Sequence, residues 1–286
     1  MSEIHLRESS SSDSNPKTKP RPKTSSIPVP FTYNPSDDGT DENLLILLHG
    51  LGAHTTFYAP SNNANLSGRI GDTQVPFGKL GRQLKLPQTA TLALRAPERI
   101  PFLYEEAFQW YTSFDPLGEL LEQPNPTPAL ELLARVLAHL AADCAWPPHR
   151  IHLFGFAQGG TVAAEAALAW WNAELAAQRA DSPHALRPLG SVVSVCGPLL
   201  SYPTLARACP TPLLLFHRPP PAGTALPASA LASFKKGFGH VVEVKMRGES
   251  MPRSEDEWRL IMQFWSEHLG RRQMDGLYEV MSGTAA

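Results

Sequence analysis

Short apolar runs alternate with helix-like patterns along most of the chain from about residue 42. Each run is bounded by turn-forming or polar residues and is too short for a typical helix. Six runs are predicted to be strands: residues 44–48, 89–94, 151–156, 191–196, 213–216 and 241–246. Nearly continuous apolar sequence of this kind is typical of parallel strands that are buried on both faces.

The segments between these runs carry apolar residues at helical spacing. Thr127 and Pro128 form an N-cap and first-turn pair, and the helix that they open has a face of Leu130, Leu133, Leu137 and Leu140. Residues 161–175 predict a second helix, and residues 254–257 have capping-box spacing before a third. The alternation predicts an α/β domain with a mainly parallel sheet and helices on both faces.

The two ends of the chain differ in composition from the part between them. Residues 1–41 are rich in Ser, Pro, Lys and Thr and have little to bury, so we expect a disordered tail there. Its basic cluster, residues 17–23, indicates a solvated segment, with a nuclear localisation signal or a phosphorylation region as alternatives. The folded domain is placed at 42–272, and residues 273–286 are expected to form a flexible C-terminal tail.

Charge and cysteine content exclude several classes of function. The chain has 25 Lys plus Arg against 27 Asp plus Glu, so we expect neither nucleic acid nor an anionic membrane as a partner. No apolar stretch reaches transmembrane length, and the N-terminus lacks the apolar core of a signal peptide, which predicts a cytoplasmic protein, with the nucleus as an alternative. Cys144, Cys196 and Cys209 have no CxxC spacing and are expected to be small buried hydrophobes. We expect no metal and no cofactor.

The stretch from Gly155 to Gly160, Gly-Phe-Ala-Gln-Gly-Gly, lies between a predicted strand and a predicted helix. Strand, Gly-x-Ser-x-Gly and helix together build a nucleophile elbow, in which glycines allow the strand and the helix to approach closely. Gly155 and Gly159 occupy the two glycine positions of this motif. Ala157 occupies the serine position and has no hydroxyl with which to attack a carbonyl.

Further motifs lie on the expected elements. His49-Gly50-Leu51-Gly52 directly follows the first strand, and Pro76-Phe77-Gly78-Lys79-Leu80 and Arg95-Ala96-Pro97 follow it in order. Trp110-Tyr111-Thr112-Ser113-Phe114-Asp115 lies before the elbow. On these motifs the chain resembles the acyl-protein thioesterase group of the phospholipase/carboxylesterase family, from about Leu44 to Leu269. The resemblance implies the α/β-hydrolase fold.

The resemblance also implies a site with a Ser–His–Asp triad, two backbone oxyanion donors and an apolar acyl channel. The donors would be the backbone N–H groups of Leu51 and Gln158, and Trp110 would lie beside the acyl pocket. The serine position is Ala157. In the family the acid follows the strand that corresponds to residues 213–216, but the stretch from His217 to Gly223 contains none. The histidine should follow the last strand, where Glu249 is nearest to its place. No catalytic residue is therefore expected.

Several other residues are candidate substitutes for the triad side chains. A migrated nucleophile at Ser194 or Cys196 needs a base and an orienting group within hydrogen-bond reach, and we expect these residues to be part of the core or of strand ends. The same holds for His217. Other side chains that fall away from the catalytic places are His139, His152, His240, His268 and Asp256. His49 is expected to hydrogen-bond the oxyanion loop.

Three functional hypotheses follow. The first is a non-catalytic family member, a pseudoenzyme, that binds an apolar small molecule, an acyl chain or a protein partner in the vestigial cleft. The second is an active serine-type carboxylesterase or thioesterase with an unrecognised catalytic set. The third is a scaffold that acts through the N-terminal tail. Loss of all three triad side chains favours the first hypothesis, because a change confined to the serine would leave the acid and the base in place.

Overall fold

The computed structural model describes residues 18–51, 73–100, 107–115, 117, 119, 121–179, 185–248 and 251–272, together with the backbone of 57–58 and 65–66. The main strands are β1 (Phe31–Asn34), β2 (Asn43–Leu48), β5 (Thr89–Leu94), β8 (Ile151–Phe156), β9 (Ser191–Val195), β10 (Leu213–His217) and β11 (Val241–Lys245). The helices are α1 (Gln74–Leu84), α2 (Thr127–Ala142), α3 (Gln158–Arg179), α4 (Ala230–Gly237) and α5 (Glu255–His268), with a short 3-10 turn at Pro148–Arg150. Two short pairs, β3–β4 (Phe57–Tyr58, Asn65–Leu66) and β6–β7 (Glu98–Arg99, Phe108–Gln109), complete the elements.

Seven strands form one sheet in the order β1-β5-β2-β8-β9-β10-β11. Every neighbouring pair is parallel except β1 and β5, which are antiparallel. Leu48 is opposite Gly155, and Phe156 is opposite Val195. The segments that leave β2, β8 and β9 therefore emerge side by side at the carboxyl edge of the sheet, which is where open α/β sheets bind ligands.

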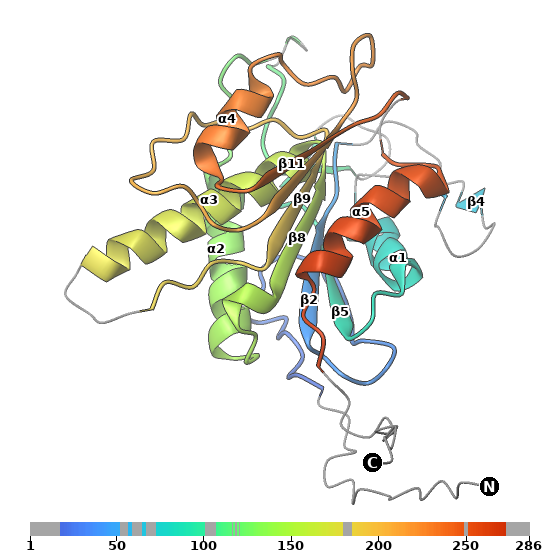
Figure 1. Ribbon diagram of the computed structural model, residues 1–286, viewed down its shortest axis with the longest axis vertical. Helices are drawn as coiled ribbons and strands as arrows, with labels where there is room; N and C mark the ends of the chain where they lie inside the picture. Colours follow the sequence, from blue (N-terminus) through green and yellow to red (C-terminus); the bar gives the residue numbers. More distant parts are fainter. Residues whose placement is uncertain are drawn as a thin grey trace, which may run out of the picture.

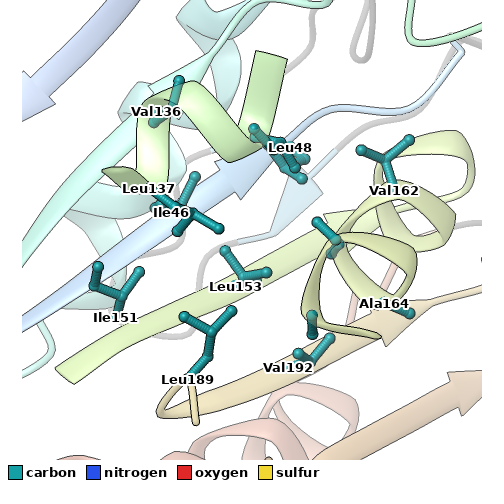
Figure 2. Packing of buried hydrophobic residues seen from close by; sticks show 14 of the residues in the cluster. Ile46, Leu48, Val136, Leu137, Ile151, Leu153, Val162, Ala164, Leu189 and Val192 are labelled. Carbon is teal, nitrogen blue, oxygen red and sulfur yellow. The ribbon is translucent and has the colours of Figure 1, made fainter. Parts of the chain in front are cut away.

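Helices cover both faces of the sheet, with α2 and α3 on one side and α1 and α5 on the other (Figure 1). Successive residues of β2 alternate between two apolar cores: Ile46 and Leu48 face α2 and α3, whereas Leu45 and Leu47 face α1 and α5. Figure 2 shows the first core, where side chains of β2, β8 and β9 pack against α2 and α3. The predicted fold class, a mainly parallel sheet with helices on both faces, is confirmed.

The N-terminal segment differs from the prediction of a disordered tail over 1–41, which is wrong for residues 18–41. β1 pairs with β5 along its whole length, and Ile27 is buried in the core under it. Buried Asp41 accepts hydrogen bonds from the backbone N–H groups of Lys19 and Ser36, both at 2.9 Å. Composition hid this order because only a few apolar residues of the segment pack against the core, and backbone pairing and one buried carboxylate complete its attachment. Residues 1–17 and the predicted tail 273–286 lie outside the described residues.

Helix ends follow the predicted signals in one case and differ in another. Ser254 and Glu257 form the predicted capping box at the start of α5. At α2, Thr127 is the first helical residue rather than the cap, and the Asn125 side chain accepts a hydrogen bond from its N–H at 3.0 Å. Among the described residues, none of the helices combines the length and the apolar character that crossing a bilayer requires.

Candidate functional site

The turn between β8 and α3 has the backbone of a nucleophile elbow. Ala157 adopts the left-handed conformation with φ +48°, which a residue with a Cβ rarely takes. Its N–H donates to Val195 O at 2.8 Å, and its carbonyl accepts the Thr161 N–H at 3.0 Å. A Cβ on Gly155 would lie 2.1 Å from Gly159 O, and one on Gly159 would lie 2.3 Å from Leu48 O. The two glycines are thus required by the close approach of the strands and the helix, whatever residue stands between them.

His49 fixes the loop after β2. The imidazole is fully buried, its Nε2 accepts the Ala96 N–H at 2.9 Å, and its Nδ1–H donates to Gly50 O at 3.0 Å. The indole N–H of Trp110 donates to His49 O at 2.6 Å. Because both ring nitrogens are engaged with backbone groups, His49 positions the loop that carries half-buried Leu51, in the structural role expected for it. The N–H groups of Leu51 and Gln158 remain predicted oxyanion donors.

The Gln158 side chain connects the elbow to the segment at 110–113. Its carbonyl oxygen accepts the Trp110 N–H at 3.0 Å, while its amide donates to Tyr111 O at 2.9 Å and to Ser113 Oγ at 2.7 Å. Trp110 itself is fully buried beside His49. From the sequence, Gln158 is expected to act only through its backbone N–H, as an oxyanion donor. A polar residue at the first turn of a helix that opens in the core was the signal for this second role, because such a side chain needs buried partners.

The loop after β10, predicted to lack an acid, contains a buried arginine instead. Arg218 is 1% exposed and pairs with Glu257 at the start of α5. Its guanidinium also donates to Arg247 O at 2.9 Å and to Met251 O at 3.2 Å. The preceding residue, His217, points its Nε2 at Glu243 on β11 at 2.8 Å. Sequence reasoning missed Arg218, although an isolated charge between a buried strand and a proline run was the available signal.

Arg218 and Glu257 together form a buried clamp between the loops after β10 and β11. Burial alone would raise the pKa of Glu257, but hydrogen bonds from Arg218 and from the Arg253 N–H hold it below its ordinary value. Both charged groups thus have hydrogen-bonded partners, as buried charges require. The clamp joins the two loops where the resemblance expects the acid and the base. Glu249, the residue nearest to the base position, lies outside the described residues.

None of the substitute nucleophiles has an activated environment. Ser194 Oγ donates to the nearby Gly197 O at 3.1 Å. Cys196 is buried beside the elbow, and burial raises the pKa of its thiol, which opposes formation of a thiolate. His152 is fully buried at the start of β8 with its Nδ1 2.8 Å from Ser191 Oγ, and burial lowers its pKa to about 3. All three cysteines are free and buried, as predicted.

A triad-like group of side chains does occur away from the elbow, at the end of α2. Cys144 Sγ lies 3.6 Å from His139 Nε2, and His139 Nδ1 lies 2.6 Å from Asp143 Oδ2. The thiol is 1% exposed, and burial raises its pKa. The backbone N–H of Lys23 donates to the same Nε2 at 3.1 Å. This group therefore fastens the N-terminal segment to α2 rather than presenting a nucleophile, and it supplies the partners of His139 that the sequence did not reveal.

Comparison with known proteins identifies the family. No family model matches the chain. An uncharacterized hydrolase of Mycosarcoma maydis, UM10204, is 36% identical over 248 residues, which cover 85% of this chain and 82% of that protein. Among solved structures, esterase PE8 has a TM-score of 0.59 at 20% identity, covering 84% of this chain and 99% of its own. Acyl-protein thioesterase 2 of Zea mays has a TM-score of 0.58 at 19% identity, covering 85% of this chain and 100% of its own.

The two solved structures show the fold of the chain. The family is shown by the Mycosarcoma relative, because its similarity covers most of both chains. The chain belongs to one family with the Mycosarcoma hydrolase and has the α/β-hydrolase fold of esterase PE8 and of acyl-protein thioesterase 2, in agreement with the resemblance predicted from its motifs.

Proposed function

We propose that this chain is a non-catalytic member of its family that binds an apolar ligand or a protein partner at the vestigial cleft. The observation that carries the proposal is the methyl group of Ala157. This residue has the left-handed backbone conformation of the elbow position at which active α/β-hydrolases have their nucleophile. A methyl group forms no covalent acyl intermediate. The cleft would be bounded by Leu51, Ala157, Gln158, Trp110 and the turn at 246–252.

The Arg218–Glu257 clamp supports the same proposal. A general base must reach the proton that it removes within hydrogen-bond distance. The carboxylate of Glu257 is instead engaged by a guanidinium and by two backbone N–H groups, those of Arg253 at 2.7 Å and Ser254 at 3.3 Å. Its depressed pKa makes it a weaker proton acceptor than a free carboxylate.

Activity assays on the purified chain test the proposal. We expect no hydrolysis of short-chain p-nitrophenyl esters or thioesters above a heat-killed control, and no labelling by a fluorophosphonate. Removing a catalytic triad leaves about 10³–10⁴-fold catalysis over water from the oxyanion hole and binding, which is too slow for such an assay. Robust turnover that persists after contaminating serine esterases are titrated out would establish the alternative, an active carboxylesterase or thioesterase.

A scaffold role for the N-terminal tail is the third hypothesis. Residues 18–41 belong to the folded domain, so such a role falls to residues 1–17. Deleting residues 1–17 and measuring partner binding tests it. We propose a cytoplasmic location, with the nucleus as the alternative; the three free buried cysteines are compatible with a reducing compartment.

A further inference from the structure

One loop presents half of the large apolar side chains that the described residues expose. Phe114 is 43% exposed, Leu117 87% and Leu121 38%, and all three belong to the loop at 113–121. The other three, Val75, Tyr202 and Val242, come from separate parts of the chain. Single exposed apolar residues are ordinary, whereas a group of them at one place marks an interaction site.

The described residues of this loop make several hydrogen bonds. The Leu121 N–H donates to Ser113 O, and the Asp115 N–H donates to Glu119 O, both at 2.9 Å. The Asp115 carboxylate accepts the N–H groups of Leu117 and Glu119, again at 2.9 Å. At the base of the loop, the Gln158 amide holds Ser113. These hydrogen bonds connect the described residues of the loop to one another and to the elbow.

The charge of the surrounding sequence is one-sided. Between Arg99 and Arg135 the chain contains six acidic residues and no basic residue, although the chain as a whole is nearly balanced with 25 basic and 27 acidic residues. Glu119 and Glu122 are exposed within and directly after the loop. A field of this sign attracts cationic groups and repels an anionic bilayer.

We propose that the loop at 113–121 docks a segment of a partner protein in which basic side chains are interleaved with apolar ones. The proposal rests on and deepens the proposed function, because it gives the chemistry of a partner that docks beside the elbow, where Gln158 holds Ser113. Two of the chain's basic residues are engaged away from the loop: Lys19 Nζ donates to Ala145 O at 2.8 Å, and the Lys23 N–H donates to His139, both near the C-terminal end of α2.

Binding of synthetic peptides to the full chain tests the proposal. The probe is a fluorescent amphipathic peptide of Lys and Leu, compared with a Glu/Leu peptide of the same pattern, by fluorescence anisotropy at low and at raised salt. We expect the Lys/Leu peptide to bind at least about tenfold more tightly than the Glu/Leu peptide and to weaken as salt increases.

Two variants of the loop locate the binding. The charge-reversal variant Glu119→Lys with Glu122→Lys should bind the Lys/Leu peptide about tenfold or more weakly than wild type does, and it should bind the Glu/Leu peptide more tightly. Glu267→Lys on α5 should change neither affinity. Replacing Phe114, Leu117 and Leu121 by Ser should abolish binding, and Val75→Ser with Tyr202→Ser serves as the control. Circular dichroism of each variant confirms that it is folded.

The proposal is overturned if Glu267→Lys and the loop charge reversal act alike, if the apolar loop variant binds as wild type does, or if anionic vesicles or a second copy of the chain compete at this loop while the Lys/Leu peptide does not. These outcomes are independent of the ester and thioester assays. Failure of the docking proposal therefore leaves the non-catalytic assignment standing, and turnover in those assays leaves the peptide measurement interpretable.

Discussion

The elbow after β8 and the loops after β10 and β11 match the site predicted from the family resemblance to different degrees. The elbow keeps its backbone, including the left-handed Ala157 and its two tightly packed glycines. The two loops instead meet in the Arg218–Glu257 clamp. The difference teaches that the elbow geometry is a packing requirement of the fold. The acid and base positions carry no such requirement, so other side chains can occupy them.

The variant Gly155→Ala tests the claim that the elbow geometry is a packing requirement, and it should have the largest effect. The added methyl would lie 2.1 Å from Gly159 O, a backbone atom that cannot move away. We expect the variant to lose more than about 4 kcal/mol of the free energy of unfolding or not to fold at all. Denaturant unfolding measures the loss. Gly223→Ala is the matched control, since a Cβ there meets nothing within 4 Å, and it should stay within about 0.5 kcal/mol of wild type.

The clamp itself is tested with Arg218→Met. Removing one partner of a buried ion pair leaves an uncompensated charge and costs about 3–5 kcal/mol. Adding Glu257→Gln should recover part of the loss, because the remaining charge is removed and the side chain can still cap α5. Arg259→Met breaks the exposed pair with Asp256 and should have an effect within about 0.5 kcal/mol. Equal effects at the buried and the exposed pair would contradict the clamp.

The same pair predicts a pH dependence. The pKa of Glu257 is lower in the folded chain than its ordinary value of 4.5, so its stabilising effect is complete above pH 4.5 and is lost as the pH falls below it. His152 acts in a different window: its pKa falls from 6.5 to about 3, so the unfolded chain takes up a proton first and stability declines below pH 6.5. Each titration contributes at most about 1.4 kcal/mol per pH unit.

Unfolding of wild type and of Arg218→Met across pH 3–7 separates the two windows. The decline between pH 6.5 and 4.5 should be the same in both proteins, and the additional decline below pH 4.5 should be smaller in Arg218→Met, which keeps only the backbone hydrogen bonds to Glu257. A variant that shows the same additional decline would indicate that the Arg218 contact does not set the pKa of Glu257.

A smaller effect is expected from Gln158→Ala, which releases the segment at 110–113 from the elbow. The Trp110 N–H and Tyr111 O lose their partners in a buried setting, so we expect a loss of about 1–3 kcal/mol. Hydrogen exchange at the Trp110 N–H should accelerate while exchange in β9 does not. Gln263→Ala, on the half-exposed outer part of α5, is the control substitution. Unchanged exchange at Trp110 would show that the Gln158 side chain does not hold the segment.

The smallest effect is expected from Ala157→Ser, which restores only the nucleophile position. The left-handed backbone already accommodates a Cβ, so stability should change by less than about 0.5 kcal/mol. Activity should remain absent, because an unassisted hydroxyl is a poor nucleophile at neutral pH. Adding Glu249→His still lacks the orienting acid, whose loss lowers kcat by about 10⁴. Brisk ester turnover by the single variant, with fluorophosphonate labelling, would reveal a base and an acid elsewhere.

The sequence by itself determined the six parallel strands, the fold class and the missing nucleophile. Strands such as β5 and β8 are recognisable because burial on both faces favours apolar residues at most positions. The identity of Ala157 needs no structure, because a methyl group has no nucleophilic atom in any fold. The capping box of α5 was equally readable, since its partners are three residues apart.

Only the tertiary structure decided which distant groups meet. Arg218 and Glu257 are 39 residues apart, and Gln158 reaches a segment about 45 residues earlier. The order of residues 18–41 likewise depends on β5 and on Asp41, which local composition does not report. Local patterns record burial and backbone preference, whereas buried polar pairs are chosen by the geometry of the whole chain. For this reason the clamp, the Gln158 link and the N-terminal strand became visible only in the folded protein.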